Sequence, residues 1–533
     1  MLRRFTSYGP VTPRSNFFVP RTALVESCVE LLVGQQEEPG GHYFTIWAPR
    51  QTGKTWLMRR AVEEIRARYG ERFIVGTLSM QGSGVSREAP PGDFLAEVPA
   101  LFRRGMGLTL AAPSSWSAWG ELFAKGAGIF DRPLILLIDE FDKLPPAVID
   151  ELVGQFRSLY LERKGSLLHG LALVGVRALL GVESGSRAPF NVQRWLHVPN
   201  LTRDEVADLF RQYQGESGQV VEPAVVDALF EVTRGQPGLV GWFGELLTER
   251  YNPRPEPISV KTWRRVYAAA CQVEPNNTML NLLKKAKGPY LPQLLEVFSR
   301  TDVPFSFGQD WCNYLYLNGI LTDQETVGAN GEPFHVCRFS SPFVQQRLFN
   351  DLSKEFVERV RDLPLDPMDT LADVFTEAGL DVPALLRRYV AFLGRLHKKG
   401  ADPWPMTLND QPRRADLRHT EAVGHFHLYN WLCAAVGTRC LISPEFPTGN
   451  GTVDLVLRWQ GHLGVIEVKS FVDQHRLALG QAQAAAYAKK LGLGAATLAV
   501  FVPLLDEAVL SKLSGQRDID GITVTTVALP WEP

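Results

Sequence analysis

Two clusters of residues in this sequence have the types and spacing needed for phosphate chemistry, and the first lies at 48–55. The stretch APRQTGKT follows an apolar run, HYFTIWA (42–48), and precedes a helical pattern that begins WLMRRAVEEI. Backbone N–H groups in such a loop, together with the start of the following helix, favour a bound phosphate. The alternative is a chance Gly-Lys-Thr turn. We expect the following residues to bind a nucleotide: Pro49, Arg50, Gln51, Thr52, Gly53, Lys54 and Thr55.

Three residues of this loop are expected to have separate roles in nucleotide binding. Gly53 allows the backbone to approach the phosphates closely, Lys54 reaches the β- and γ-phosphates, and Thr55 offers its hydroxyl to Mg²⁺. A second element, LILLIDE (134–140), supports this interpretation because an apolar run there ends in two acids. Asp139 would hold Mg²⁺ through water, and Glu140 would polarise the attacking water. A simple strand-end turn is the alternative interpretation of these two acids. Together the two motifs predict an ATP site.

Several segments around these motifs resemble one family of ATPases. They are NFFVPR (16–21), the two phosphate motifs, APFNV (188–192) followed by LTRDEVADL, and TRGQPGLV (233–240). The sequence over roughly 16–350 is similar to AAA-like, STAND-type ATPases related to origin-recognition ATPases. The resemblance implies a P-loop parallel sheet, a helical lid and a winged helix, with Gly235 and Pro237 matching a Gly-x-Pro motif of the lid. It also implies a nucleotide-binding role for Pro237 and a homo-oligomer formed through the ATPase domain.

Two arginines bear on whether the nucleotide is hydrolysed or only bound. Arg177 follows the apolar run LALVGV (171–176), where the family carries a polar sensor residue, and is an uncertain substitute for it. Arg187 could reach the phosphate of a neighbouring subunit, although an ordinary surface arginine is the alternative. Binding of ATP is therefore the firmer expectation, and hydrolysis follows from the resemblance.

The second cluster lies near the end of the sequence, in GTVDLVLRW (451–459) and GVIEVKS (464–470). Glu467 and Lys469 are two residues apart, so on a strand they point to the same face. If the two segments pair as a hairpin, Asp454 can approach that face. Two carboxylates that meet there can bind Mg²⁺, and the lysine can orient water or offset charge on a scissile phosphate. A solvated hairpin with a Glu/Lys pair is the alternative.

The pattern Asp-x₁₂-Glu-x-Lys between two helical segments resembles the PD-(D/E)XK nuclease fold, over residues 412–530. The resemblance assigns Asp454, Glu467 and Lys469 to catalysis, with Mg²⁺ as the metal and Mn²⁺ as a possible substitute. It also adds Glu421 on the first helix, whose alternative role is an acid stabilised by the helix dipole. Gln483 and Tyr487, in QAAAY, match a pattern of recombination-type exonucleases, or else form part of an amphipathic helix. Members of the family often carry Arg where this sequence has Thr452.

Basic residues suggest where nucleic acid would bind, with DNA favoured over RNA. One group surrounds Trp404, and a second lies in the candidate winged helix. A solvated linker is an equally good interpretation of the first group. The basic residues of the first group are Arg395, His397, Lys398, Lys399, Arg413, Arg414 and Arg418, and those of the second are Lys284, Lys285 and Lys287. A metal cluster of Glu421, His425 and His427 is the least favoured interpretation, because no second pair of ligands stands out.

Composition limits the remaining possibilities. The 533 residues suggest three or four domains, and 45% hydrophobic residues supply several cores. These values exclude a disordered, collagen-like or coiled-coil protein, and a net charge of −2 excludes a global basic field. The six cysteines form no CxxC pair, which indicates free thiols. We expect neither a signal peptide nor a membrane span, and therefore a cytoplasmic protein without membrane partners.

We therefore expect an α/β multidomain chain in which an ATP switch controls a Mg²⁺-dependent nuclease that cleaves DNA. The resemblance places such a protein in prokaryotic defence or DNA processing, with partner proteins of the same system. One alternative is a regulatory or DNA-remodelling ATPase whose nuclease-like domain only binds nucleic acid or a partner. The predicted segments are the P-loop ATPase core (1–202), helical lid (203–258), winged-helix-like segment (259–350), helical linker (351–411) and PD-(D/E)XK nuclease-like domain (412–533).

Overall fold

The computed structural model of the chain describes residues 3–9, 11–34, 40–81, 84, 90–175, 194–252, 256–299, 302–327, 331–357, 363–377, 379–399, 417–444, 454–503 and 505–531. The chain divides into two compact units. The first consists of Met1–Ala270 and Tyr316–Gly319, and the second of Cys271–Leu315 and Ile320–Pro533. This two-unit division does not test the five-segment division expected from the sequence. The five-segment division therefore stays a prediction.

The first unit is built on a sheet of five strands, all of them parallel. Strand β3 is buried along its whole length, which agrees with the continuous apolar run that predicted it. The parallel sheet that the resemblance implied is therefore confirmed. Across the sheet the strands are β2 (Ile74–Ser79), β3 (Leu134–Asp139), β4 (Leu168–Gly175), β1 (Tyr43–Trp47) and β5 (Arg194–His197).

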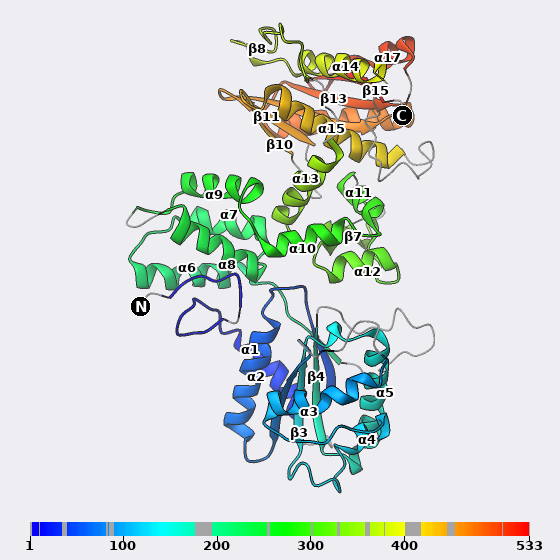
Figure 1. Cartoon of the computed structure of the whole chain (residues 1–533). Coiled ribbons are helices and arrows are strands. Elements are labelled where there is room, and N and C mark those ends of the chain that lie inside the picture. Colours follow the sequence, from blue (N-terminus) through cyan, green and yellow to red (C-terminus); the bar gives the residue numbers. More distant parts are fainter. Residues whose placement is uncertain are drawn as a thin grey trace. The chain divides into compact units, whose positions relative to one another are not determined.

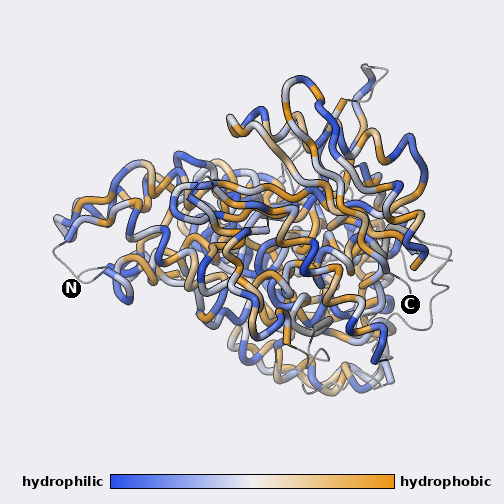
Figure 2. Tube along the Cα trace, turned by 90° about the horizontal axis from the view of Figure 1, so that it is seen from above, coloured by the Kyte–Doolittle hydropathy of each residue, from blue (hydrophilic) through white to orange (hydrophobic). Residues whose placement is uncertain are grey.

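Helices cover both faces of this sheet (Figure 1). On one face, α1 and α2 pack on strand residues such as Ile46 and Val174, while α3, α4 and α5 enclose Trp119 and Leu136 on the other. Along the tube of Figure 2, helices alternate between hydrophobic and hydrophilic residues, as expected of elements with one buried face. The helices are α1 (Thr22–Val33), α2 (Lys54–Tyr69), α3 (Asp93–Met106), α4 (Trp116–Glu121) and α5 (Pro146–Leu161).

A helical segment follows the sheet in the first unit. It begins at a capping box, in which Glu205 N–H donates to Thr202 Oγ1 and Thr202 N–H donates to Glu205 Oε2. Phe5 from the N-terminal segment packs on Phe210, with 4.9 Å between ring centroids. The elements are α6 (Arg203–Ser217), α7 (Pro223–Thr233), α8 (Pro237–Glu245), a π-helical turn (Leu246–Arg250) and α9 (Val260–Gln272), which ends in the second unit.

The second unit begins with helices and a hairpin. Strands β6 and β7 pair antiparallel. The winged-helix interpretation of this region stays a prediction. The elements are α10 (Asn277–Ala286), α11 (Leu291–Ser299), α12 (Asp310–Leu317), β6 (Leu321–Val327), β7 (Pro333–Phe339) and α13 (Pro342–Val357).

The C-terminal part of the second unit contains a six-stranded sheet. The central strands β12, β13 and β15 are parallel, and the remaining pairs are antiparallel. The order across the sheet is β10 (Leu441–Pro444), β11 (Leu455–Trp459), β12 (His462–Ser470), β13 (Ala495–Val502), β15 (Ile522–Pro530) and β14 (Gly515–Ile519). Its helices are α14 (Val382–Lys398), α15 (Leu417–Val436), α16 (Gln474–Lys490) and α17 (Glu507–Leu513).

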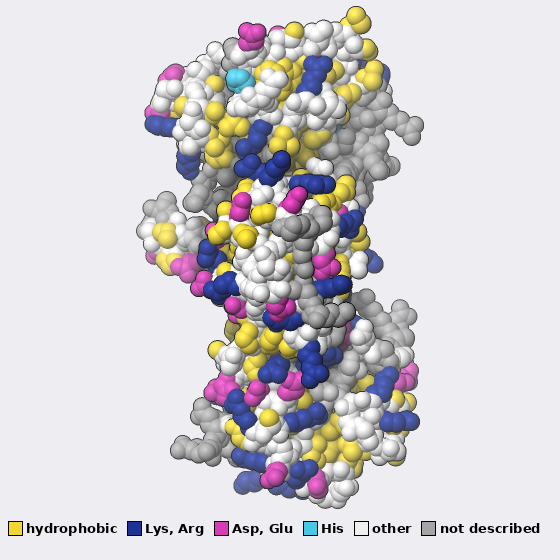
Figure 3. All heavy atoms as spheres, turned by 90° about the vertical axis from the view of Figure 1, so that its left-hand side faces the viewer, with side chains coloured by type: hydrophobic (Ala, Val, Ile, Leu, Met, Phe, Trp, Pro, Cys, Tyr) yellow, Lys and Arg dark blue, Asp and Glu magenta, His cyan; other side chains and the backbone are white. Residues whose placement is uncertain are grey.

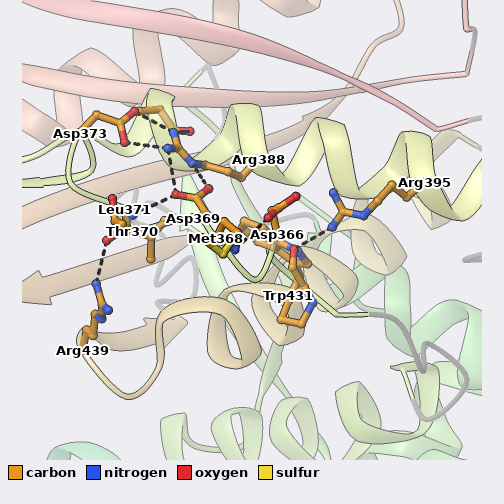
Figure 4. A network of polar contacts seen from close by, with 12 residues as sticks. Asp366, Met368, Asp369, Thr370, Leu371, Asp373, Arg388, Arg395, Trp431 and Arg439 are labelled. Carbon is orange, nitrogen blue, oxygen red and sulfur yellow. Dashed lines mark hydrogen bonds and ion pairs between the residues drawn. The ribbon is translucent and has the colours of Figure 1, made fainter.

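Helix α14 packs on strands β12, β13 and β15, so this part of the expected linker covers the C-terminal sheet. Polar contacts fix the preceding segment to the helix (Figure 4). The Arg388 guanidinium bonds both Asp369 and Asp373, at distances between 2.7 and 3.3 Å. This segment also forms a short hairpin of β8 (Phe375–Thr376) and β9 (Gly379–Leu380).

The surface bears both signs of charge, since Lys and Arg side chains are interspersed with Asp and Glu on the face shown in Figure 3. This agrees with the absence of a global basic field in the composition. Within the described parts of the chain, none of the helices has the length and apolar character needed to cross a membrane.

Candidate functional site

The loop between β1 and α2 has the backbone shape expected of a phosphate-binding loop. Gln51 and Gly53 adopt positive φ angles of 59° and 93°. A Cβ added at Gly53 would have no atom within 4 Å, so the backbone conformation, and not lack of space, requires glycine at this position. Helix α2 begins at Lys54, directly after this glycine, so its first N–H groups face the loop.

Lys54 folds back onto the loop. Its Nζ donates hydrogen bonds to Ala48 O and Pro49 O, at 2.7 and 2.6 Å. Loss of solvent lowers the pKa of Lys54 to about 8, against the opposing effect of Asp142 and Asp139. The loop carbonyls therefore place the ammonium at the phosphate-binding loop.

Thr55 and Asp139 meet although one begins a helix and the other ends a strand. Thr55 Oγ1 donates to Asp139 Oδ2 over 2.9 Å, and the Glu140 N–H donates to Asp139 Oδ1 over 2.9 Å. Burial raises the pKa of Asp139. A hydroxyl and a carboxylate are oxygen ligands of the kind that Mg²⁺ prefers beside substrate phosphates. These two residues therefore fit Mg²⁺ at a nucleotide.

Glu140 lies next to this pair, in a left-handed conformation with φ 56°. Its Oε2 accepts a hydrogen bond from Lys143 Nζ at 2.6 Å. The carboxylate is thus held by a neighbouring lysine, and it would have to leave this partner to act on water.

Two further segments touch the loop, and sequence reasoning had pointed to only one of them. Gly238, next to Pro237 at the start of α8, donates its N–H to Gln51 O over 3.0 Å. Gly319 packs against Pro49, because a Cβ at Gly319 would lie 2.8 Å from Pro49 Cβ. The contact of Gly319 was missed because it joins residues that are distant in sequence, and no local pattern marks it.

The second cluster forms where β11 and β12 pair. Asp454 directly precedes β11, and the register Leu455↔Ile466 places it opposite Glu467 on β12. Lys469 Nζ lies 2.9 Å from Glu467 Oε1 and 3.9 Å from Asp454 Oδ2. The Val468 N–H donates to Asp454 Oδ2 over 2.6 Å. The structure therefore brings the three expected residues together.

Glu421 reaches the same lysine from helix α15. Its Oε1 lies 3.5 Å from Lys469 Nζ, and its Oε2 accepts the Ser470 N–H over 3.1 Å. Burial raises the pKa of Glu421, and it raises the pKa of Glu467 to about 8. Burial alone would lower the pKa of Lys469, but the surrounding carboxylates outweigh it and raise that pKa. The cluster thus holds more acids than its single cation can neutralise.

Two buried carboxylates beside one another fit a divalent cation, since Mg²⁺ is commonly held by one or two carboxylates plus water and phosphate oxygens. Asp454 and Glu467 are both buried and share Lys469 as a partner. In the described parts of the chain, no group of three or more His, Cys, Asp or Glu side chains is arranged to hold a metal ion. A metal at either cluster would therefore need phosphate or water oxygens to complete its coordination.

Helix α16 carries the remaining expected catalytic residues. It passes close to the lysine, because a Cβ at Gly480 would lie 3.3 Å from Lys469 Cγ. Gln483 is exposed and Tyr487 is half-buried, one and two turns beyond Gly480. Their assignment to catalysis stays a prediction.

The basic residues proposed for nucleic acid are placed only in part. Arg395 Nη2 donates to the carbonyl oxygens of Leu363 and Pro364, so its guanidinium fixes a loop (Figure 4). His397, Lys398 and Lys399 are exposed at the end of α14, and Lys284 and Lys287 are exposed at the end of α10, where Lys285 is half-buried. Outside the described residues, or with undescribed side chains, lie Arg177, Arg187, Trp404, Arg413, Arg414, Arg418 and Thr452.

The chain is similar to several solved structures at low sequence identity. No protein-family model matches this sequence, and no curated protein matches it. Among solved structures, a Walker-type ATPase of Pyrococcus abyssi is similar at 14% identity and a TM-score of 0.43, over 64% of this chain and 98% of that one. The Orc1 protein of Aeropyrum pernix in complex with DNA is 16% identical, with a TM-score of 0.32, over 63% and 93% of the two chains.

The RuvB Holliday junction branch migration motor of Thermotoga maritima is also similar. It is 15% identical, with a TM-score of 0.33, over 60% of this chain and 92% of that chain. All three TM-scores are below 0.5, so the fold described here rests on the sheet order and packing of this chain itself. None of these three proteins is named as a nuclease, and the C-terminal cluster is therefore interpreted from its residues alone.

Proposed function

We propose that this chain is an ATP-binding and ATP-hydrolysing switch that controls a Mg²⁺-dependent nuclease acting on DNA. The observation that carries the proposal is the convergence of Asp454, Glu467 and Glu421 on the ammonium of Lys469. Buried charged groups are costly unless they are paired, and such clusters of shifted pKa are typical of catalytic sites. The pair of Thr55 and Asp139 supports the nucleotide half of the proposal.

In the ATPase half, the residues of the loop bind and orient the nucleotide. Backbone N–H groups around Gly53 face the phosphates, and Lys54 exchanges its bonds to the loop carbonyls for phosphate oxygens. Thr55 and Asp139 would hold Mg²⁺, which neutralises charge on the phosphates. Glu140 would orient the attacking water after release from Lys143. Contacts of Gly238 with the loop would report the nucleotide to the helical segment.

In the nuclease half, Asp454 and Glu467 would hold Mg²⁺, or Mn²⁺ in its place. The bound metal lowers the pKa of water and polarises the phosphate. Lys469 lies against Glu467 at 2.9 Å, where it can orient the water or offset charge on the scissile phosphate. Glu421 fixes Lys469 and the backbone of Ser470 from the neighbouring helix. Exposed basic residues such as Lys398 and Lys399 would contact the DNA backbone.

A second candidate function is a regulatory or DNA-remodelling ATPase whose C-terminal domain only binds nucleic acid or a partner. The observation that favours it is that the Lys469 ammonium already pairs with Glu467 at 2.9 Å and with Glu421 at 3.5 Å. Under this alternative, the Lys469 cluster is a buried ion-pair network, and no cleavage occurs under any condition.

A cleavage assay decides between the two. Purified protein is mixed with plasmid, single-stranded DNA or RNA, with Mg²⁺ or Mn²⁺, and with or without ATP. We expect DNA cleavage that Lys469→Ala abolishes, whereas Lys512→Ala, which changes an exposed lysine of the same unit, keeps the wild-type rate. Lys54→Ala shows whether ATP controls cleavage. Absence of cutting in every lane would overturn the nuclease proposal and favour the binding-only alternative.

A further inference from the structure

The start of helix α8 holds two successive peptide groups of the phosphate-binding loop. Gln236 Nε2 donates to Arg50 O over 3.1 Å. The Gly238 N–H donates to Gln51 O over 3.0 Å. Because the oxygen and the hydrogen of a trans peptide point in opposite directions, these bonds direct the N–H groups of Gln51 and Thr52 away from α8. A phosphate is bound by successive N–H groups fixed in this way, so α8 helps to set the shape of the loop.

The loop needs this support because Gln51 has an unfavourable backbone conformation. Its φ of 59° lies in the left-handed region. A residue with a side chain keeps such a conformation only where the surrounding contacts impose it. A Cβ at Gly238 would lie 2.7 Å from Gln51 Cβ, so glycine lets α8 approach this residue closely. A displacement of α8 would therefore release Gln51 from the conformation that the loop requires.

Further along α8, two more glycines receive the segment 5–7, which we call the strap. A Cβ at Gly241 would overlap the carbonyl oxygen of Thr6, and a Cβ at Gly244 would overlap the ring of Phe5. Residues three apart are neighbours on a helix surface. The strap thus packs on α8 within about two helical turns of the contact with the loop.

The strap joins α8 to a second helix. Glu245, the last residue of α8, accepts hydrogen bonds from the N–H of Ser7 over 2.7 Å and from its hydroxyl over 3.1 Å. Phe5 is buried and packs on Phe210 of α6, with 4.9 Å between ring centroids. Since the strap is fixed to α6 as well, α8 cannot shift away from the loop without disturbing these contacts.

We propose that the strap is a positioning element for the phosphate-binding loop, in which Phe5 and Ser7 hold α8 so that α8 keeps the loop in its phosphate-binding shape. The consequence for ATP affinity rests on the proposed nucleotide function, whereas the effect of the strap on the loop can be measured without nucleotide. Such coupling is reciprocal: if the strap strengthens ATP binding by a given factor, bound ATP strengthens the docking of the strap by the same factor.

The test perturbs the strap from both sides. Gly244→Ala adds a methyl group that overlaps the ring of Phe5, and Phe5→Ala removes this ring. Gly215→Ala is the matched control, because it adds the same methyl group near the end of α6, where the new atom would meet nothing within 4 Å. In the double variant, Gly244→Ala should add little to Phe5→Ala, since most of the atoms that it would overlap are absent. Independent effects would add.

The first readout is amide hydrogen exchange at Gly238, whose N–H donates to Gln51 O. Without nucleotide, we expect about fivefold faster exchange in Gly244→Ala and in Phe5→Ala, as for the loss of one hydrogen bond. Exchange in Gly215→Ala should stay as in the wild type. The second readout is ATP affinity by calorimetry, which should weaken about fivefold in the two strap variants and remain unchanged in the control.

The third readout is exchange of the Ser7 amide in the wild type, which donates to Glu245. Saturating ATP should slow this exchange by a factor similar to the loss of ATP affinity in the strap variants. Unchanged Gly238 exchange in both strap variants, effects equal to those of Gly215→Ala, or a Ser7 amide indifferent to bound ATP would overturn the inference. Wild-type protein that binds no ATP would overturn the proposed nucleotide function, while exchange at Gly238 would still decide whether the strap positions the loop.

Discussion

Thr55 and Asp139 are 84 positions apart in the sequence, and the hydroxyl of one donates to the carboxylate of the other over 2.9 Å. The sheet order explains this contact, because β4 alone separates β1, which leads to Thr55, from β3, which ends at Asp139. The carboxyl ends of parallel strands lie at one edge of a sheet, where ligands of such folds bind. The pair therefore marks the metal side of the proposed nucleotide site.

Thr55→Val should remove the effect of Mg²⁺ on ATP affinity. The change keeps the shape of the side chain and deletes the hydroxyl, so we expect ATP binding with Mg²⁺ to weaken about tenfold or more. Binding without Mg²⁺ should stay as in the wild type. Calorimetry with and without chelator measures both values. Lys54→Ala should lose affinity under both conditions, and an undiminished Mg²⁺ effect in Thr55→Val would contradict the assignment.

Gly319→Ala should weaken ATP binding although Gly319 lies outside the loop. The new Cβ would come within 2.8 Å of Pro49 Cβ, so the loop must shift by several tenths of an ångström. We expect several-fold weaker binding by calorimetry. Gly218→Ala is the matched control, because its φ of 70° resembles the 78° of Gly319 and its Cβ would meet nothing within 4 Å. Both variants bear the strain of a left-handed residue, about 1–2 kcal/mol. Equal affinities in the two variants would refute the prediction.

Arg388→Ala should destabilise the C-terminal part of the second unit. The guanidinium bonds Asp369 and Asp373, and thereby fixes the segment before α14 to that helix (Figure 4). Asp373 is largely exposed, so most of the lost stability should come from the ion pair with Asp369. We expect a cost of about 1–3 kcal/mol in urea denaturation. Arg387→Ala, which changes the exposed neighbour, should leave the midpoint near the wild-type value, and equal shifts would contradict this account.

His427 should make the protein lose stability in mild acid. Burial lowers the pKa of His427 to about 4, from an ordinary value of 6.5. Between these two values the unfolded chain binds a proton that the folded chain does not, so the free energy of unfolding falls as pH decreases from 6.5 to 4. This decrease in the free energy of unfolding is absent above pH 6.5. It reaches roughly 3 kcal/mol once the pH has fallen to the folded-state pKa of His427.

The measurement is the free energy of unfolding of the wild type and of His427→Leu between pH 4 and 7. The ionisable group that faces His427 is Tyr389, whose pKa burial raises well above 10 and which stays neutral in this range. The dependence on pH should therefore be shallower in His427→Leu. Parallel curves for the two proteins would show that His427 does not carry the effect.

Much of the arrangement around the two clusters could be predicted from local patterns. The apolar run before Asp139 predicts a buried strand that ends there, and the structure has β3 at that place. Alternation within GVIEVKS places Glu467 and Lys469 on one face of β12. Both predictions depend on periodicity over a few residues, which short-range geometry determines.

Other contacts could not be predicted because they join distant segments. Nothing near Gly319 indicates that it packs on Pro49. Strand β14, with the sequence GQRDI, was missed because a charged edge strand lacks apolar alternation. The amphipathic pattern of α14 indicates a helix but not which sheet it covers.

The four residues Tyr316–Gly319 belong to the first unit, whereas the chain on either side of them belongs to the second. The polypeptide therefore passes between the two units three times, after Ala270, before Tyr316 and after Gly319. A fragment that ends near residue 270 would lack the side chain that packs on Trp47, with 5.7 Å between the rings of Trp47 and Tyr316. A cut after Ala270 thus separates Tyr316 from the rest of the first unit, whereas a fragment that ends after Gly319 keeps both parts of that unit together with 271–315 of the second.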